Sequence, residues 1–388
     1  MSNFKLVFDI EADGLDPNNV WCIVAKEVSG GIHKFDNTQI EEGIEFLKTA
    51  DTLIGHNIIG YDMPVLEKLY GATFDCNIED TLVMSRLFNP VRENGHSLKA
   101  WGWRVGSLKQ QQPETFDEYT PAMLDYCVQD VKLNEAVYHY LLREGNVFSD
   151  ESIRLEHDVA KIMKEQEKTG FFFNTKQAME LLAELKAKQI AVEDEVHSTF
   201  KPKLVDDKLV TPYIRKDGEL SKRGLTDEEY NKCITTQNMN PFMRQKLVDF
   251  NLGSRKQIGE YLIDFGWKPV KFTPTKQPIV DEGTLKKIEH IKEAKLIADF
   301  LLYQKRIAQV TSWIDELKED RVHGSVIPNG TITGRMTHRN PNMAQVPNAG
   351  SPYGKECRSC WTVPKGRKLV GIDASGLELR MLAHYMND

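Results

Sequence analysis

The sequence has few cysteines and no long apolar run, and both absences exclude whole classes of protein. Six cysteines scattered over 388 residues are too few for the dense disulfide framework of a small secreted domain. No stretch approaches the roughly 20 apolar residues that a membrane-spanning helix needs, and Asp9 interrupts the first apolar segment too early for a secretory signal. We therefore expect a cytoplasmic protein, neither secreted nor inserted in a membrane.

Charge is distributed unevenly along the chain. Residues 1–150 carry 12 basic and 24 acidic side chains, whereas the remaining 238 residues carry 38 and 33. An acidic part beside a mildly basic part suits a metal-binding carboxylate site next to a surface for polyanions. On charge alone, ordinary surface variation is the simpler explanation. With 40% hydrophobic residues over this length, the chain can bury two or three cores.

The first 150 residues alternate between strand and helix patterns. Short β-prone runs lie at Lys5–Phe8, Val20–Val28 and Thr52–Gly55. Helical spacing of apolar residues follows at Gln39–Lys48, Pro64–Tyr70, Glu79–Phe88 and Pro121–Arg143. The pattern predicts an α/β domain that ends near residues 145–150, where Gly, Asn and Ser interrupt the periodicity.

Long charged helices dominate the part of the chain after residue 150. Helical patterns occupy Glu151–Lys168, Thr175–Phe200, Ser254–Phe265 and Asp281–Leu317. Residues 201–249 form a polar interlude of weak periodicity, with 10 basic and 8 acidic side chains. The last seventy residues are expected to be richer in strands, including the segment around the lone Cys357-x-x-Cys360 pair.

Four acids of the first domain have the spacing of a metal site. Asp9 and Glu11 alternate at the end of the first strand, so both carboxylates lie on one face of a sheet. Tyr126 and Asp130 are four residues apart on one helix face, and Asp62 lies between the two pairs in sequence. Four carboxylates can hold two Mg²⁺ ions about 4 Å apart for in-line phosphodiester hydrolysis. A capping or surface acid is the simpler interpretation of Asp62 or Asp130 taken alone.

The ordered set resembles the DEDD exonuclease superfamily in its tyrosine subclass. Its three motifs are matched, in order, by Asp9 and Glu11, by Asn57 with Asp62, and by Tyr126 with Asp130. The resemblance implies an RNase H-like fold, 3′→5′ exonuclease activity, and two Mg²⁺ ions held by the four acids, with Mn²⁺ as an alternative. It also implies that Glu11 contacts the terminal 3′-hydroxyl and that Leu15 wedges against the last base.

A second resemblance lies near the C-terminus. Residues 368–373 read as an apolar strand ending in a carboxylate, and Leu377–Met386 reads as a helix. Residues 373–380, Asp-Ala-Ser-Gly-Leu-Glu-Leu-Arg, resemble motif A of the family A DNA polymerases, and most of all the T-odd phage type; residues 333–347 match another segment of that family. The resemblance covers the whole chain as an exonuclease domain (1–150), a mainly helical thumb (151–320) and an incomplete α+β palm (321–388).

This second resemblance implies roles for five residues of the palm. Asp373 becomes a polymerase metal ligand that binds Mg²⁺ once the site is complete, and Glu378 blocks the ribose 2′ position of an incoming nucleotide. Arg335 reaches the minor groove at the primer end, and Asn342 and Gln345 are further candidates for that surface. The partner is DNA, both as primer–template and as single-stranded 3′ ends, held through phosphates by the basic thumb.

Residues 201–249 are expected at the tip of the thumb. In the T-odd phage enzymes a longer insertion at this place binds host thioredoxin, and such a chain works in the host cytoplasm. The insertion here is shorter and has an excess of only two positive charges. A loop that touches DNA is therefore the expected role of the tip, with a thioredoxin site as the alternative.

Two motifs of a family A polymerase do not occur in these 388 residues. One is the fingers helix that binds the triphosphate, and the other is the His-Asp-Glu turn that supplies the second palm carboxylate. The sequence therefore predicts the N-terminal part of a polymerase, either one half of a split polymerase or a truncation. Its synthesis would depend on a C-terminal fragment that supplies both motifs. Two alternative interpretations of the chain are a free-standing exonuclease and a non-catalytic subunit that binds DNA or assists assembly.

Overall fold

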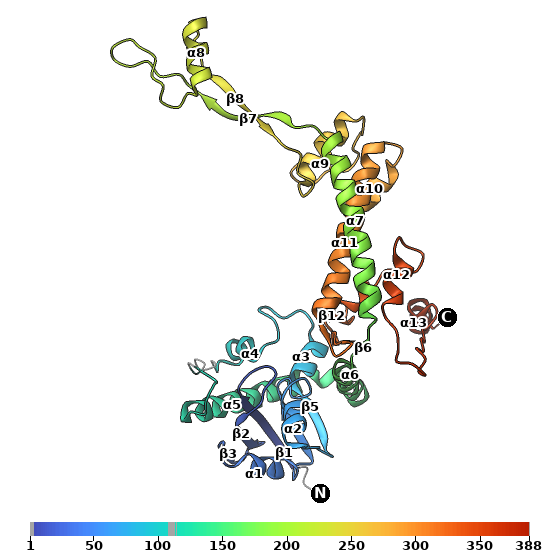
Figure 1. Cartoon of the computed structure of the whole chain (residues 1–388). Helices are drawn as coiled ribbons and strands as arrows, with labels where there is room; N and C mark the ends of the chain where they lie inside the picture. Colours follow the sequence, from blue (N-terminus) through green and yellow to red (C-terminus); the bar gives the residue numbers. More distant parts are fainter. Residues whose placement is uncertain (1–3, 108–112, 114, 388) are drawn as a thin grey trace. The chain divides into compact units, whose positions relative to one another are not determined.

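The computed structural model describes residues 4–107, 113 and 115–387 (Figure 1). The chain separates into two compact units, each with a hydrophobic core of its own. The first unit comprises Met1–Thr175 with Ser312–Asp388, and the second comprises Lys176–Thr311. None of the helices formed by the described residues is long and apolar enough to cross a membrane.

A five-stranded sheet in the order β3-β2-β1-β4-β5 forms the base of the first unit. The strands are β1 (Lys5–Ala12), β2 (Val20–Glu27), β3 (Ile32–Phe35), β4 (Thr52–Gly55) and β5 (Asn77–Asp80). The central strand β1 pairs antiparallel with β2 and parallel with β4. All three predicted strands are confirmed, and β1 extends four residues beyond its predicted end, to Ala12, so that Asp9 and Glu11 belong to the strand itself.

Helices cover both faces of this sheet and divide its residues between two cores. One face is covered by α1 (Ile40–Leu47) and α2 (Asp62–Tyr70), which pack with Leu6, Phe8 and Ile10 of β1. The other face is covered by α3 (Thr81–Phe88), α4 (Leu98–Val105) and α5 (Pro121–Glu144), which pack with Val7. Because side chains alternate along a strand, Asp9 and Glu11 lie on the face covered by α5.

The helix predicted over Glu79–Phe88 begins two residues late. Asn77–Asp80 pairs in parallel with β4 instead, and the Asp80 side chain then accepts a hydrogen bond from the Leu82 amide at 2.9 Å. This bond is an N-cap, so Asp80 ends the strand and starts α3. Sequence periodicity missed the strand because only four residues form it.

The long helix α6 (Asp150–Thr169) joins the sheet to the remainder of the first unit. Its N-cap Ser149 accepts a hydrogen bond from Ser152 at 3.2 Å, and its buried His157 contacts β5. Short strands follow in two small sheets: β6 (Phe171–Phe172), β9 (Leu317–Lys318) and β10 (Arg321–Val322) in one, and the hairpin of β11 (Ser325–Ile327) and β12 (Thr337–Arg339) in the other.

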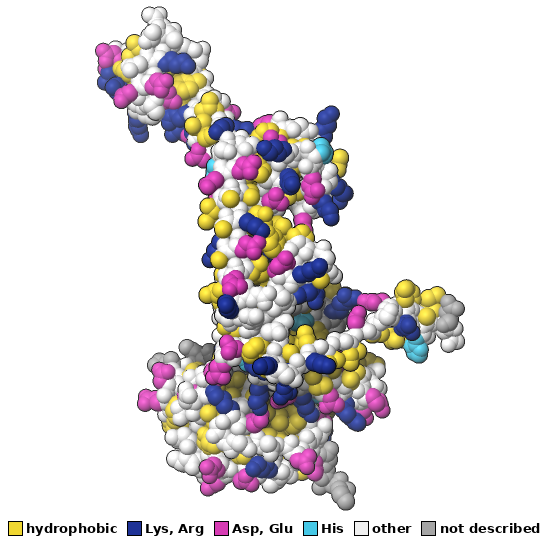
Figure 2. Space-filling model, turned by 45° about the vertical axis from the view of Figure 1, so that its right-hand side comes forward, with side chains coloured by type: hydrophobic (Ala, Val, Ile, Leu, Met, Phe, Trp, Pro, Cys, Tyr) yellow, Lys and Arg dark blue, Asp and Glu magenta, His cyan; other side chains and the backbone are white. Residues whose placement is uncertain are grey.

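Two expectations about the C-terminal segment were wrong. Cys357 lies in a short helix, α12 (Gly354–Ser359), rather than in a strand, and Cys360 follows it; both thiols are buried. Residues 368–373 form no strand, because no other described segment pairs with them, and Ile372 is 96% exposed. The helix α13 (Leu377–Met386) occurs as predicted, and Figure 2 shows hydrophobic side chains gathered on it.

The second unit consists mainly of helices. These are α7 (Thr175–Thr199), α8 (Asp227–Thr236), α9 (Arg255–Asp264), α10 (Glu282–Lys287) and α11 (Lys292–Asp315). The single helix predicted over Asp281–Leu317 divides in two at a turn, where the Ile291 amide donates to the Ile288 carbonyl at 2.8 Å. The turn allows both Leu285 and Ile297 to enter the core.

The polar interlude of residues 201–249 contains a two-stranded antiparallel ribbon that the sequence did not predict. The strands are β7 (Lys203–Val210) and β8 (Phe242–Val248). Leu204, Leu209 and Leu247 on the ribbon are each more than 60% exposed. Because the ribbon buries neither face, its residues carry no apolar alternation from which a strand could be predicted.

Candidate active site

The two acids of β1 converge with a thiol of α5. Carboxylate oxygens of Asp9 and Glu11 and the sulfur of Cys127 all lie within 4.8 Å of one another. Glu11 is 9% exposed, so this group lies at the edge of the core and retains access to solvent. The structure therefore confirms that the two carboxylates share a face, and that face is turned toward α5.

Cys127 is a neighbour of the acids that sequence reasoning missed. Its sulfur donates to the Asp9 carbonyl at 3.4 Å and to Asp9 Oδ2 at 3.8 Å. Burial raises the pKa of the Cys127 thiol well above its usual value. A neutral thiol is a weak ligand for a hard cation, so the two carboxylates are the donors that suit Mg²⁺ or Mn²⁺ here.

Asp62 connects α2 to the same strand. Its Oδ1 accepts a hydrogen bond from the amide of Ile10 at 3.2 Å, and Ile10 is the residue between Asp9 and Glu11. The side chain is 3% exposed. Burial raises the pKa of the Asp62 carboxyl to about 7, and the charge of Asp80 adds to this rise. The third acid is therefore adjacent to the strand that carries the first two.

Negative charge also surrounds the residue that precedes Asp62. The pKa of Tyr61 is raised to about 12, chiefly by burial and further by the charges of Asp62 and Glu11. Its hydroxyl donates to the carbonyl of Gly14, in the loop that follows β1, at 2.5 Å. Tyr61 thus fixes this loop beside the acids, and the predicted base wedge Leu15, which follows Gly14, is 95% exposed.

The predicted third motif lies on α5. The helix begins where Thr120 accepts a hydrogen bond from Met123 at 3.4 Å, with Pro121 in its first turn. Tyr126 and Asp130 are each 3% exposed, four residues apart on one face. They share α5 with Cys127, whose sulfur contacts Asp9. The close cluster among the described residues includes Asp9 and Glu11, but neither Asp62 nor Asp130.

A second missed residue, Asp80, holds the turn that contains Asn57. Its oxygens accept hydrogen bonds from the amides of Asn57 at 2.9 Å and Ile59 at 3.1 Å, besides the bond that caps α3. Asn57 itself is exposed and has a positive φ of 68°, which asparagine tolerates better than most residues. The Asp-Thr pair before an apolar helix is the signal that could have identified Asp80 as a cap.

Asp62→Asn is expected to stabilise the protein at pH 8 when divalent cations are removed. The folded state holds the Asp62 proton more tightly than the ordinary value of 3.8 implies, so stability is lost as pH rises from about 4 to about 7. Asparagine cannot ionise and avoids this loss. Thermal unfolding in EDTA at pH 8 should show a higher Tm for Asp62→Asn than for the wild type, by about 2–4 °C for each kcal/mol of unfolding free energy gained. At pH 5 the rise in Tm should be smaller.

The exposed Asp125→Asn on α5 is the matched control, and its Tm difference from the wild type should not change between the two pH values. An Asp62→Asn protein no more stable than the wild type at pH 8 would show that the buried carboxyl costs nothing when ionised.

The palm candidates lie apart from the acids of β1 in sequence and are largely exposed. Arg335 Nη2 and Glu378 Oε1 are 3.2 Å apart, with side chains 74% and 80% exposed. Asp373 is exposed in the segment that forms no strand. Asn342 precedes the single 3₁₀ turn that includes Gln345. The structure thus brings Arg335 and Glu378 together and leaves Asp373 in unpaired backbone.

Sequence comparison gives one family match and several relatives. Residues 226–388 match the model of DNA polymerase family A. The DNA-directed DNA polymerases of Escherichia phage T7 and Enterobacteria phage T3 are 31% and 32% identical over 86% and 88% of this chain. A DNA polymerase I of Helicobacter pylori is 35% identical over 36% of this chain and 16% of its own length. The chain spans 62% of the length of each phage relative.

Among the solved structures that resemble the chain, one covers all of it. The POL domain of Pol1 from M. smegmatis, solved in complex with DNA primer-template and dNTP, superposes with a TM-score of 0.71. The superposition covers 100% of this chain and 60% of that one, at 15% sequence identity. At this identity the likeness concerns the fold.

Proposed function

The chain belongs to DNA polymerase family A, and we propose that its residues 1–150 form a 3′→5′ exonuclease that proofreads DNA. One observation carries this proposal: Asp9 and Glu11 share a face of β1, and Asp62 accepts a hydrogen bond from the amide between them. A mixed sheet with helices on both faces is the architecture expected of an RNase H-like domain.

The residues of the site fit a pair of divalent cations. Hard carboxylate oxygens from Asp9, Glu11, Asp62 and Asp130 would hold Mg²⁺ or Mn²⁺, and the buried Asp62 would ionise readily once a cation is near. The cations would stabilise the charge that develops in an in-line displacement at phosphorus. Tyr126 is proposed to orient the attacking water.

Two further residues are proposed to position the end of the strand. Glu11 contacts the terminal 3′-hydroxyl, and the exposed Leu15 packs against the last base. Asn57, whose carbonyl accepts a hydrogen bond from the Tyr61 amide at 3.0 Å, is proposed to contact DNA. Digestion of a 5′-labelled single-stranded oligonucleotide with Mg²⁺ tests the proposal, because shortening from the 3′ end is expected and an undigested strand would contradict it.

The remainder of the chain is proposed to hold DNA and to begin the polymerase site. Asp373 would bind a metal and Glu378 would exclude ribonucleotides, once a C-terminal segment supplies the fingers and the second palm carboxylate. The ion pair of Glu378 with Arg335 is exposed on both sides, and such pairs contribute little stability. DNA can therefore displace Glu378 from Arg335, and an incoming nucleotide can occupy the space beside Glu378.

DNA binding by the full chain should weaken steeply with salt, because phosphate contacts release counterions. Arg335→Ala is expected to cost about 1–3 kcal/mol at a primer terminus, the loss of one good groove contact. Fluorescence anisotropy with a labelled primer–template measures both effects. Arg143→Ala, an exposed arginine of α5 to which no DNA contact is assigned, is the control. A flat salt response would favour the alternative role of a non-catalytic assembly subunit.

The ribbon at residues 201–249 is proposed to touch DNA at the tip of the thumb. Its exposed Leu204, Leu209 and Leu247 favour a second candidate, a protein partner such as thioredoxin, because exposed apolar side chains are typical of protein interfaces. Replacing the three leucines with serine should leave DNA binding unchanged in the first case. It should abolish binding of thioredoxin in the second, measured by pull-down of the purified protein.

A further inference from the structure

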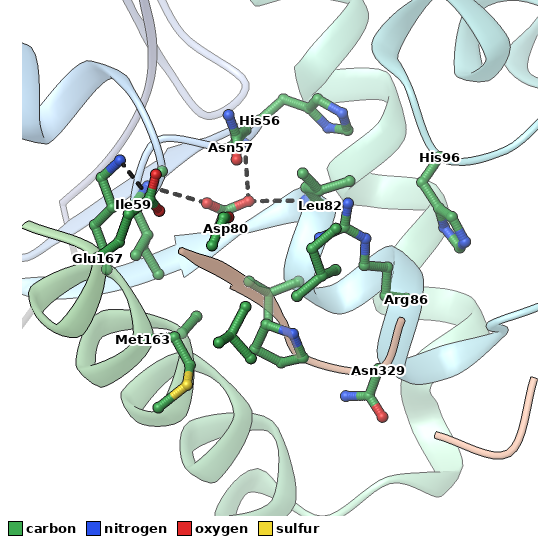
Figure 3. A pocket seen from close by; sticks show the side chains of 18 of the residues that line it. His56, Asn57, Ile59, Asp80, Leu82, Arg86, His96, Met163, Glu167 and Asn329 are labelled. Carbon is green, nitrogen blue, oxygen red and sulfur yellow. Dashed lines mark hydrogen bonds and ion pairs between the residues drawn. The ribbon is translucent and has the colours of Figure 1, made fainter. Parts of the chain in front are cut away.

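A cavity of about 530 Å³ in the first unit lies apart from the acids proposed for the exonuclease. It is enclosed by the turn at residues 56–60, the start of α3, one side of α6 and the hairpin of β11 and β12 (Figure 3). Asp9, Glu11 and Asp62 are not among the described residues that line it, whereas Asn57, proposed above to contact DNA, is. Its volume is within the range of small-ligand sites.

Two arginines give the cavity an excess of positive charge. Arg86 of α3 is partly buried and Arg339 of β12 is exposed, and both line the cavity. Burial lowers the pKa of the Arg86 guanidinium; the charge of Asp80 opposes this fall, and the charge of Arg339 adds to it, so the two arginines repel each other. No carboxylate of the described part of the chain forms an ion pair with either one.

The other charged groups of the cavity are already engaged. Lys164 and Glu167 of α6 pair at 3.7 Å. Asp80 accepts hydrogen bonds from the backbone amides of Asn57, Ile59 and Leu82 (Figure 3). A site that concentrates two unpaired guanidinium groups therefore favours an anion from outside, and phosphate is the anion that guanidinium groups bind in the best geometry.

Apolar side chains line the same cavity. They include Leu82, Met163 and Pro328, together with Val326 and Ile327 of β11. Such surfaces accept the face of a nucleic-acid base, and arginine planes stack on bases as well. The cavity thus offers a phosphate site and a base site within the space of one nucleotide.

We propose that this cavity binds one nucleotide unit of DNA, with its phosphate between Arg86 and Arg339 and its base against Leu82 and Met163. The unit comes either from an unpaired strand or from a nucleoside monophosphate released from one. The inference rests on the proposed function, because the protein must handle DNA, but it does not depend on cleavage.

The test measures binding of two probes to the full chain in EDTA, so that no cleavage occurs. Deoxyadenosine monophosphate represents the free nucleotide, and a short oligothymidylate represents the strand; isothermal titration follows both. Arg86→Gln and Arg339→Gln should each weaken binding about tenfold, as for loss of a charge-assisted hydrogen bond. Arg143→Gln, an exposed arginine of α5 outside the cavity, should leave the affinity unchanged.

The pattern of losses identifies the source of the nucleotide. If both probes bind and both weaken, the site accepts free monophosphate; if only the oligonucleotide binds and weakens, it accepts a strand. Equal affinity of the wild type and both glutamine variants, or no binding of either probe, overturns the proposal. Arg339 is exposed, so its variant still decides the matter if Arg86→Gln does not fold. Absence of exonuclease activity with Mg²⁺ would refute the proposed nuclease without altering this result.

Discussion

Replacing Asp9 and Glu11 with alanine is expected to abolish removal of nucleotides from the 3′ end of DNA. The two carboxylates share one face of β1 and converge within 4.8 Å, so the double variant removes half of the proposed cation ligands. Loss of cation-based charge stabilisation is worth several kcal/mol, which corresponds to a rate at least about a thousandfold lower. A gel that follows a 5′-labelled single strand over time, with Mg²⁺ or Mn²⁺, measures the rate.

Glu41→Ala with Glu42→Ala is the matched control, because it removes two exposed acids from α1 of the same unit. This variant should digest DNA at the wild-type rate. Circular dichroism should show that both double variants remain folded. Digestion that survives loss of Asp9 and Glu11, or that survives EDTA, would refute the assignment.

Asp373→Ala is expected to abolish primer extension while leaving the exonuclease intact. The proposed polymerase ligand Asp373 and the nuclease acids of β1 belong to different elements, so each site should fail alone. The 388-residue chain by itself should extend no primer, because the motifs expected for the fingers helix and the second palm carboxylate do not occur in these residues. Mixed with a fragment that supplies both, it should form a complex that extends primers.

Primer-extension gels of each component, of the mixture, and of the mixture with Asp373→Ala measure this dependence. Glu378→Ala serves as the companion variant and should extend primers but admit ribonucleotides, since the side chain is proposed to fill the space of the 2′-hydroxyl. Robust synthesis by the 388-residue chain alone would refute the requirement for a partner. A mixture that synthesises equally well with Asp373→Ala would refute the proposed metal ligand.

The sequence predicted features that depend on local periodicity. The shared face of Asp9 and Glu11 follows from the alternation of a strand, and α5 and α13 follow from helical spacing. The contact of Cys127 with Asp9 joins residues 118 positions apart, and no local pattern encodes such a pairing. Tertiary contacts decide these neighbours.

Two further failures of prediction have the same cause. Residues 368–373 have the composition of a buried strand, yet a strand forms only where another segment pairs with it. The ribbon at residues 201–249 shows the reverse, because its two strands pair although neither buries a face. The composition of a segment indicates whether it suits burial, whereas strand formation depends on whether another segment pairs with it.

The hydrogen bond from the Asp80 amide to His157 Nε2, at 2.7 Å, ties α6 to the sheet and bears on where a fragment with the proposed nuclease could be cut. A cut at residue 150 would remove α6, and with it the buried imidazole that reaches β5 and the Ala160 side chain that packs on the sheet core. A fragment of the proposed nuclease intended for crystallisation or for hydrogen exchange should therefore extend through Thr169, so that it keeps α6 and its contacts with the sheet.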